Sequence, residues 1–517
     1  MEQLRILWVD DEVDSLKAHV MMLEKKGYVV DTAANAESAI DAVRDHTYDA
    51  ILLDEHMPGR TGLDCLPDLK ALAPQVPVVM ITKSEEDGLM EEAIGESIAD
   101  YLLKPVQPRQ VLASLTRVLG GRKLVESRSL VQYQMEFGRL TADIATASSW
   151  SDWVSAYQSW LRWERRLTGA DAEAMRHMLA HQRDEANRLF TRFWADHYPD
   201  WISSEDAPCD FSHQIMDRHV APLLEQGRKV VLVVIDNLRM DQWHELQPIF
   251  TEHFRIEDEQ AYAAMLPTAT QYARNALFSG MLPRDLAKLY PNRWVKDVSD
   301  AESGRNAHEG EFLEEWAARR EFSKPVYGKL SNPYHEQKWV DQWAQKRGAD
   351  LTAVVVNFVD RISHAKTEQS IVREIATDDR GFRALTHSWL KNSPLRAWMR
   401  QLAEERVDVI ITTDHGTLAV DHAVSIKGPR EVAANLRYKV GRGLSYRPKD
   451  VALEIDPESI GIPSVALGDK AVFAGKSDYF VYPTQYHKYA GQFDGSYQHG
   501  GISMEEVIVP IARLSAK

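Results

Sequence analysis

The sequence has 517 residues, of which 44% are hydrophobic and 27% are charged, and its formal net charge is −16. This length exceeds one ordinary hydrophobic core and predicts about three domains, while the acidic balance argues against tight binding to duplex DNA, which needs clustered Lys and Arg. The two cysteines, Cys65 and Cys209, lie far apart in the sequence, which excludes a disulfide framework and a cysteine-based metal site.

The first 120 residues predict an α/β domain. The opening stretch, MEQLRILWVDDE, becomes acidic too early for a signal peptide, and no run approaches the ~20 apolar residues of a membrane helix, so we expect a cytoplasmic protein without membrane insertion. Short apolar strands alternate with helical stretches in residues 1–120. This alternation predicts a doubly wound parallel sheet of five strands.

Five polar side chains are expected at the carboxyl ends of these strands, where open α/β sheets place their sites. They are Asp10, Asp11, Asp54, Thr82 and Lys104. Three converging carboxylates repel one another unless a hard cation joins them, and Mg²⁺ suits such a cluster.

The motifs VDDE, LLDEHMPGRTGLD, MITKSE and DYLLKP resemble the receiver domain of two-component response regulators. The resemblance covers the first 120 residues and implies that Asp54 accepts a phosphoryl group. The magnesium ligands that it implies are Asp10, Asp11, Asp54 and the carbonyl of His56. The signalling residues that it implies are Thr82 and Lys104, which contact the phosphoryl group, and Tyr101 at the switch-aromatic position. Phosphorylation is then expected to change a dimer face.

Residues 121–207 lack strand-like runs and carry apolar residues at helical spacing, which predicts a helical bundle. An aromatic stripe runs along it, formed by Trp153, Tyr157, Trp160 and Trp163. Such a stripe is typical of the core between small helices, and a nucleotide-stacking surface is the alternative. The segment around Pro208 is expected to be a linker.

Residues 208–517 predict a second, larger α/β domain, because strand-like runs return at KVVLVVID, DLTAVVVNFVD and VDVIITTD. Each run ends in a carboxylate, and histidines lie nearby; the six residues are Asp236, Asp360, Asp414, His364, His415 and His499. Six N/O ligands suffice for two Zn²⁺ ions, each with an open position, and the absence of thiolates suits catalytic zinc or manganese. We therefore predict a divalent-metal centre.

The candidate nucleophile is Thr270, in the stretch MLPTATQYARNALFSG. QYARNALF predicts a helix whose first turn begins near Thr270. A hydroxyl there faces the positive helix end and can reach a metal, and both influences lower its pKa and favour phosphate binding. An ordinary N-cap is the alternative role, and Thr268 is the next candidate nucleophile.

The order Asp, Pro-Thr-x-Thr, Asp-x-x-x-His, Asp-His-Gly and His-Gly resembles the alkaline phosphatase superfamily, particularly its nucleotide pyrophosphatase/phosphodiesterase branch and the PglZ domain. The resemblance covers about the last 300 residues. One metal site that it implies consists of Asp360, His364 and His499. The other consists of Asp236, Thr270, Asp414 and His415.

A receiver, a helical bundle and a PglZ domain in one chain resemble the PorX-type response regulators of Bacteroidetes. This resemblance implies an upstream sensor histidine kinase, hydrolysis of cyclic or linear oligonucleotides, and regulation of protein secretion by the type IX system. The expected partners are therefore the kinase, a phosphodiester substrate and a transcription or secretion regulator. We also expect a phosphorylation-dependent homodimer.

These residues predict a two-metal in-line displacement in which Thr270 attacks phosphorus and water then hydrolyses the phosphothreonine, with the ions roughly 3.5–4 Å apart. Asn275 either donates to a nonbridging oxygen or is a helix-surface amide. Arg274 is expected to point elsewhere, because helix neighbours lie about 100° apart. A single amide donor matches the smaller charge of a diester.

Lys329 and Lys439 are either substrate contacts or solvated lysines. Two other functions stay open: a phosphomonoesterase, and a non-enzymatic adaptor that docks a partner when phosphorylated.

Overall fold

The computed structural model describes residues 4–83, 98–167, 172–295, 304, 306–368, 378–429, 435–464 and 466–517. The chain divides into two compact units: a smaller one, Met1–Glu136 with Arg166–Met175, and a larger one, Phe137–Arg165 with Arg176–Lys517. Among the helices that the structure describes, none combines the length and the apolar character that crossing a bilayer requires.

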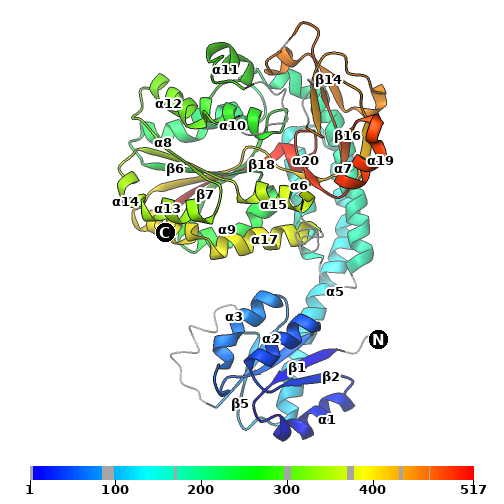
Figure 1. The fold of residues 1–517 in the computed structure, drawn as a ribbon. Coiled ribbons are helices and arrows are strands. Elements are labelled where there is room, and N and C mark those ends of the chain that lie inside the picture. Colours follow the sequence, from blue (N-terminus) through cyan, green and yellow to red (C-terminus); the bar gives the residue numbers. More distant parts are fainter. Residues whose placement is uncertain are drawn as a thin grey trace. The chain divides into compact units, whose positions relative to one another are not determined.

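The smaller unit contains a parallel five-stranded sheet in the order β2-β1-β3-β4-β5, drawn in blue in Figure 1. The strands are β1 (Arg5–Val9), β2 (Val29–Ala33), β3 (Ala50–Asp54), β4 (Val78–Thr82) and β5 (Asp100–Leu103). The helices are α1 (Lys17–Lys25), α2 (Ala36–Asp45), α3 (Gly62–Leu72) and the start of α5 (Pro108–Thr146). β3 and β4 are buried along their whole length, as apolar strands covered on both faces must be. The predicted doubly wound sheet is confirmed.

The predicted helical bundle is confirmed by three long helices. They are α5 (Pro108–Thr146), α6 (Trp150–Arg166) and α7 (Glu173–Trp201). The aromatic stripe of α6 is buried, with Trp153 at 1% and Tyr157 at 0% exposure. Trp153 packs edge-on against Phe190 of α7, at 5.4 Å between ring centroids. The stripe is therefore core, and the alternative of a nucleotide-stacking surface is wrong.

The larger unit is built on a six-stranded sheet in the order β7-β18-β10-β6-β9-β8. The strands are β6 (Val230–Ile235), β7 (Phe254–Ala263), β8 (Val326–Leu330), β9 (Leu351–Val356), β10 (Asp408–Thr412) and β18 (Ile508–Ala516). Strands β8, β9, β6 and β10 are parallel, and β18 is antiparallel to both β10 and β7. The three predicted runs are β6, β9 and β10, and all their residues are buried.

Helices cover both faces of this sheet, with α8, α10 and α12 on one face and α9, α13 and α17 on the other (Figure 1). The helix bounds are α8 (Ala221–Glu225), α9 (Met240–Thr251), α10 (Thr270–Ser279), α11 (Pro283–Leu289), α12 (Glu309–Arg319), α13 (Pro333–Asp341), α14 (Trp343–Lys346), α15 (Phe358–Glu368), α17 (Asp379–Asn392), α18 (Pro394–Glu404), α19 (Tyr486–Phe493) and α20 (Met504–Val507). The carboxyl ends of β6, β9 and β10 therefore share one edge of the sheet.

Small sheets lie between β10 and β18 in the sequence. They pair β11 (Leu418–Ala419) with β17 (Tyr497–Gln498), β12 (His422–Ser425) with β16 (Asp478–Val481), and β13 (Tyr438–Gly441) and β14 (Leu453–Ile455) with β15 (Lys470–Phe473). These pairings return the chain to the carboxyl edge of the main sheet just before His499.

The structure corrects one predicted position. Asp360 was expected at the end of a strand, but β9 ends at Val356 and Asp360 lies in the first turn of α15. Asp360 and His364 are therefore one helical turn apart, the i,i+4 spacing that places two side chains on the same helix face.

Candidate active site

Three predicted ligands meet where β6 and β10 end. Asp236 follows β6 directly, and Asp414 and His415 follow β10; one ligand atom from each lies within 4.8 Å of the others. All three are buried. Because β6 and β10 are adjacent and parallel, their carboxyl ends lie side by side and bring the three ligands together.

A second cluster consists of Asp360, His364 and His499, again with ligand atoms within 4.8 Å of one another. Asp360 and His364 come from α15, and His499 follows β17. The rings of His415 and His499 stack with centroids 4.3 Å apart, so the two clusters adjoin. This division of six ligands into two triads is the one that the resemblance implied.

The residues fit divalent cations. Asp236 Oδ1 and Asp414 Oδ2 are buried without a hydrogen-bond partner among the described residues, which is costly for a carboxylate unless a cation lies against it. Burial raises the pKa of Asp236 to about 7, against the lowering influence of Arg274, and also raises the pKa of Asp414. Burial lowers the pKa of His499 to about 3, and the neutral imidazole is the form that binds metals.

Thr270 contacts the first cluster, since its Oγ1 lies 2.9 Å from His415 Nε2. His415 Nδ1 donates to the carbonyl of Gly416 at 3.1 Å, which leaves Nε2 as an acceptor or metal ligand. Ala269 occupies the N-cap position of α10, and Thr270 is the first helical residue. The alternative that Thr270 is an ordinary N-cap is therefore wrong.

Thr268 holds a different position. It is fully buried, its Oγ1 donates to the carbonyl of Gly501 at 2.9 Å, and the same oxygen accepts from Gly500 N at 3.0 Å. Its hydroxyl is thus committed to the turn that carries His499.

Arg274 lies at the first ligand cluster. It was expected to point away, but its guanidinium pairs with Asp236 and lies 3.6 Å from Asp414 Oδ2. Its Nε donates to Glu309 of α12 at 2.7 Å. Residues four apart on a helix share a face, so Arg274 lies on the side of Thr270. Asn275 is buried and its Nδ2 donates to the carbonyl of Gln271 at 2.8 Å, which excludes the helix-surface alternative and leaves its role toward phosphate a prediction.

Two asparagines near the ligands escaped the sequence argument. Asn237 has a positive φ of 65°, and its backbone N–H donates to Asp414 at 3.3 Å while its Nδ2 lies 3.5 Å from Asp360. Asn357 Nδ2 donates to Asp236 at 2.8 Å. Asparagine adopts left-handed backbone more readily than most residues, so an Asn directly after a strand-end Asp was the available signal.

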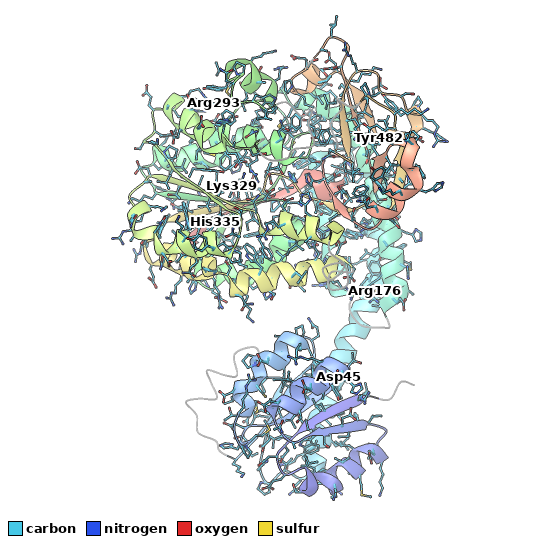
Figure 2. All side chains as sticks on the ribbon, in the orientation of Figure 1. Asp45, Arg176, Arg293, Lys329, His335 and Tyr482 are labelled. Atoms are coloured by element: carbon cyan, nitrogen blue, oxygen red, sulfur yellow. The ribbon has the colours of Figure 1, made fainter. Side chains whose placement is uncertain are left out.

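The two lysines differ in exposure: the side chain of Lys329 is exposed, as expected of a solvated lysine, whereas Lys439 is buried. Lys329, which Figure 2 labels, lies in β8 with its Nζ 3.5 Å from Glu309. Lys439 is 2% exposed, with its Nζ 5.5 Å from the ring centroid of Tyr482. Their contact with substrate stays a prediction.

In the smaller unit, Asp10, Asp11 and Asp54 form a third cluster of the same compactness. Lys104 Nζ bonds to Asp54 at 2.8 Å and to Asp10 at 3.0 Å. Burial raises the pKa of Asp54 although Lys104 lowers it, and Asp54 Oδ1 is buried without a hydrogen-bond partner among the described residues. Thr82 ends β4 and is fully buried, while Tyr101 is 51% exposed and His56 is also exposed. These positions fit a magnesium-assisted phosphoacceptor site.

Three families match successive parts of the chain. Residues 6–116 match the response regulator receiver domain, residues 123–202 match the PorX response regulator linker domain, and residues 215–514 match the BREX system PglZ alkaline phosphatase-like domain.

Single proteins resemble parts of the chain. The transcriptional regulatory protein CitT of Bacillus subtilis is 26% identical over 220 residues, which cover 42% of this chain and 95% of CitT. ZraR of Klebsiella oxytoca is 30% identical over 137 residues, 26% of this chain, and the chain spans only 31% of ZraR. Among solved structures, a CheY-like receiver domain from Methanospirillum hungatei is 26% identical, with a TM-score of 0.23, over 24% of this chain and 98% of that one.

Proposed function

Because the chain belongs to the PglZ family of alkaline phosphatase-like proteins, we propose that its larger domain is a zinc-dependent phosphodiesterase. The observation that carries this proposal is a single hydroxyl, Thr270 Oγ1, held against one of two adjoining ligand clusters. Asp360, His364 and His499 would hold one Zn²⁺, and Asp236, Asp414 and His415 the other, together with Thr270. Zinc there would act as a Lewis acid that stabilises the charge developing on the phosphate oxygens.

The chain's own residues supply the nucleophile and its orientation. Thr270 Oγ1 attacks phosphorus from the first turn of α10, where the positive end of the helix favours negative charge. The Oγ1–phosphorus bond forms as the bond to the leaving alcohol breaks. Water then hydrolyses the phosphothreonine ester and restores the hydroxyl.

The charge around the nucleophile favours a diester over a monoester. A monoester carries an additional negative charge, which a free Arg or Lys beside phosphorus would stabilise. Arg274 is the nearest such group on α10, but Asp236 and Glu309 both pair with it. The positive charge of Arg274 is thus neutralised by the protein, and Lys329 also lies against Glu309. Short or cyclic oligonucleotides are the substrates that we expect.

The test compares bis-(p-nitrophenyl) phosphate with p-nitrophenyl phosphate on the same zinc-loaded chain. We expect the higher kcat/KM for the diester and its loss in Thr270→Val. A higher kcat/KM for the monoester contradicts the diesterase and supports a phosphatase. Full signalling by a chain without turnover would instead support the adaptor function.

The amino-terminal receiver domain adds regulation to this proposal. A sensor histidine kinase would phosphorylate Asp54 with Mg²⁺ held by Asp10, Asp11 and the carbonyl of His56, and Thr82 and Lys104 would contact the phosphoryl group. The phosphorylated chain would form a homodimer. The linker matches the PorX response regulator linker domain, and from the resemblance to PorX-type regulators we propose a role in protein secretion.

A further inference from the structure

The proposed metal ligand His499 begins the segment 499–506, which is irregular until α20 starts at Met504. His499 Nδ1 donates to the carbonyl of Thr268 at 3.2 Å. The hydroxyl of Thr268 accepts from Gly500 N and donates to the carbonyl of Gly501, the two residues after His499. This hydrogen bond fixes the tautomer of His499 and leaves its Nε2 for a metal. Thr268, two residues before the proposed nucleophile Thr270, therefore holds one side of the segment 499–506.

The linker helix α7 holds the other side. Asn187 of α7 accepts a hydrogen bond from Met504 N at 2.8 Å through Oδ1 and donates to Glu505 Oε2 at 2.9 Å through Nδ2. One turn further along, Thr191 Oγ1 donates to the carbonyl of Ile502 at 3.1 Å. Asn187 is 3% and Thr191 is 8% exposed, so these bonds are protected from water. Buried hydrogen bonds with both groups satisfied fix one arrangement.

The same segment also touches the second ligand cluster. Gly416, the residue after His415, approaches the backbone of Glu505 so closely that a Cβ there would lie 1.9 Å from its carbonyl oxygen. Gly416 N donates to the carbonyl of Glu506 at 3.2 Å. A displacement of residues 502–506 would thus shift both His499 and His415.

We infer that α7 is a positioning element of the metal centre, and that Asn187 and Thr191 act through residues 502–505 to hold His499. The inference rests on the proposed metal site and extends it: a helix of the linker, outside the PglZ family match, completes the support of a zinc ligand. Neither side chain belongs to a ligand cluster, so both are positioning residues and not catalytic ones.

Three substitutions test this role without enlarging or emptying the site. Asn187→Asp keeps the acceptor for Met504 N but places a carboxylate against Glu505, Asn187→Leu removes both bonds, and Thr191→Val removes the bond to Ile502. Loss of such supporting groups typically weakens metal binding 10–100-fold. We expect roughly tenfold weaker binding of one of the two zinc ions in a chelator competition, with the second ion less affected.

A matched control lies on the same helix. Gln182 of α7 is a buried amide whose Nε2 bonds to Thr141 at 2.8 Å and to the carbonyl of Phe137 at 3.2 Å, all within the bundle. Gln182→Leu should destabilise the bundle without changing zinc affinity. Thr191→Ser retains the hydroxyl and should restore wild-type binding. Cobalt substitution gives an independent readout, because the visible spectrum of Co²⁺ reports the geometry of its ligands.

The outcomes are separable. Wild-type zinc affinity and cobalt spectrum in Asn187→Asp and Thr191→Val would overturn the inference, as would equal loss of zinc in Gln182→Leu. If Asn187→Leu does not fold, Thr191→Val decides. A wild-type chain that binds two zinc ions but hydrolyses no diester would contradict the proposed function alone, since the chelator competition tests α7 without turnover.

Discussion

Thr270 and Arg274 lie four residues apart on α10, and one helical turn brings a hydroxyl and a guanidinium to the same buried carboxylate cluster. The i,i+4 spacing puts Arg274 on the same helix face as Thr270, although its neighbour Asn275 had suggested that it points elsewhere. Arg274 pairs with Asp236 and with Glu309 of α12, so its charge serves to hold ligands in place. The electrostatics of the site depend on these ion pairs between separate elements.

Ligand loss and nucleophile loss should separate. We expect about two zinc ions per chain, because the six N/O ligands form two triads. His415→Ala removes a ligand and should lose one ion and most activity, whereas Thr270→Val removes the attacking hydroxyl and should keep both ions but lose turnover. Elemental analysis and hydrolysis of the diester measure the two effects. Substantial turnover by Thr270→Val would contradict the assigned nucleophile.

Removing Arg274 should destabilise the metal-free chain. Arg274→Met leaves Glu309 buried without its guanidinium partner, and breaking a buried ion pair from one side costs about 3–5 kcal/mol. The double variant Arg274→Met with Glu309→Gln also removes the charge of Glu309, one of the two carboxylates paired with Arg274, and should recover part of that loss. Urea unfolding of the metal-free proteins measures the difference. Equal destabilisation in the single and double variants would show that the pair itself is not the cause.

At the scale of elements, a buried charge network joins the bundle to the helices beside the sheet. Asp241 of α9 accepts from Arg239 Nε at 2.8 Å and from Arg383 of α17 at 2.9 Å, and Arg383 continues to Glu164 of α6. Tyr497 of β17, two residues before His499, donates to Asp379 of α17 at 2.8 Å. This network and the α7 contacts place the ligand-bearing turn between two anchored elements.

Asp241→Asn should destabilise the larger unit. Burial alone would raise the pKa of Asp241, but the charge of Arg239 outweighs burial and holds this pKa below its usual range. A carboxyl with a lowered folded-state pKa contributes stability above its unfolded pKa of about 3.9 and loses it as the pH falls. We expect Asn to cost about 3 kcal/mol at pH 7, and we expect this cost to shrink as the pH falls below about 3.9 toward the lowered pKa of the folded state. Exposed Asp258→Asn is the control; equal unfolding midpoints for both variants at pH 7 would contradict the network's role.

The predictable elements were those with strong local patterns. β6, β9 and β10 are short runs rich in β-branched residues, and the aromatic stripe of Trp153 and Tyr157 has helical spacing that identifies the buried face of α6. The small sheets were not predicted, because strands of two to four residues pair across long sequence separations, as β11 does with β17. Asp360 was expected at the end of a strand, but that strand ends at Val356 and a helix follows, because strand and helix ends are the least certain boundaries in a sequence.

At the scale of the whole molecule, the chain carries the proposed phosphoacceptor site in one compact unit and the ligand clusters in the other. α5, Pro108–Thr146, begins in the smaller unit and ends in the larger one. The support of His499 comes from α7, which also belongs to the linker region. If two chains associate through their linker regions, the association would act on α7, which contacts residues 502–505.

Phosphorylation of the receiver should drive the chain toward a dimer. Asp54 Oδ1 is buried without a hydrogen-bond partner among the described residues, and Lys104 donates to the other oxygen, an arrangement that suits the proposed phosphoacceptor. Tyr101 is a large side chain at 51% exposure, and its burial in a dimer face would remove apolar surface from water.

Beryllofluoride with Mg²⁺ should shift the sedimentation coefficient of the full chain toward that of a dimer. Asp54→Ala should not respond, and Tyr101→Ala should bind beryllofluoride yet remain monomeric. An unchanged sedimentation profile for the modified wild type would contradict phosphorylation-driven dimerisation. Transfer of phosphate from acetyl phosphate to Asp54 tests separately whether the receiver accepts a phosphoryl group.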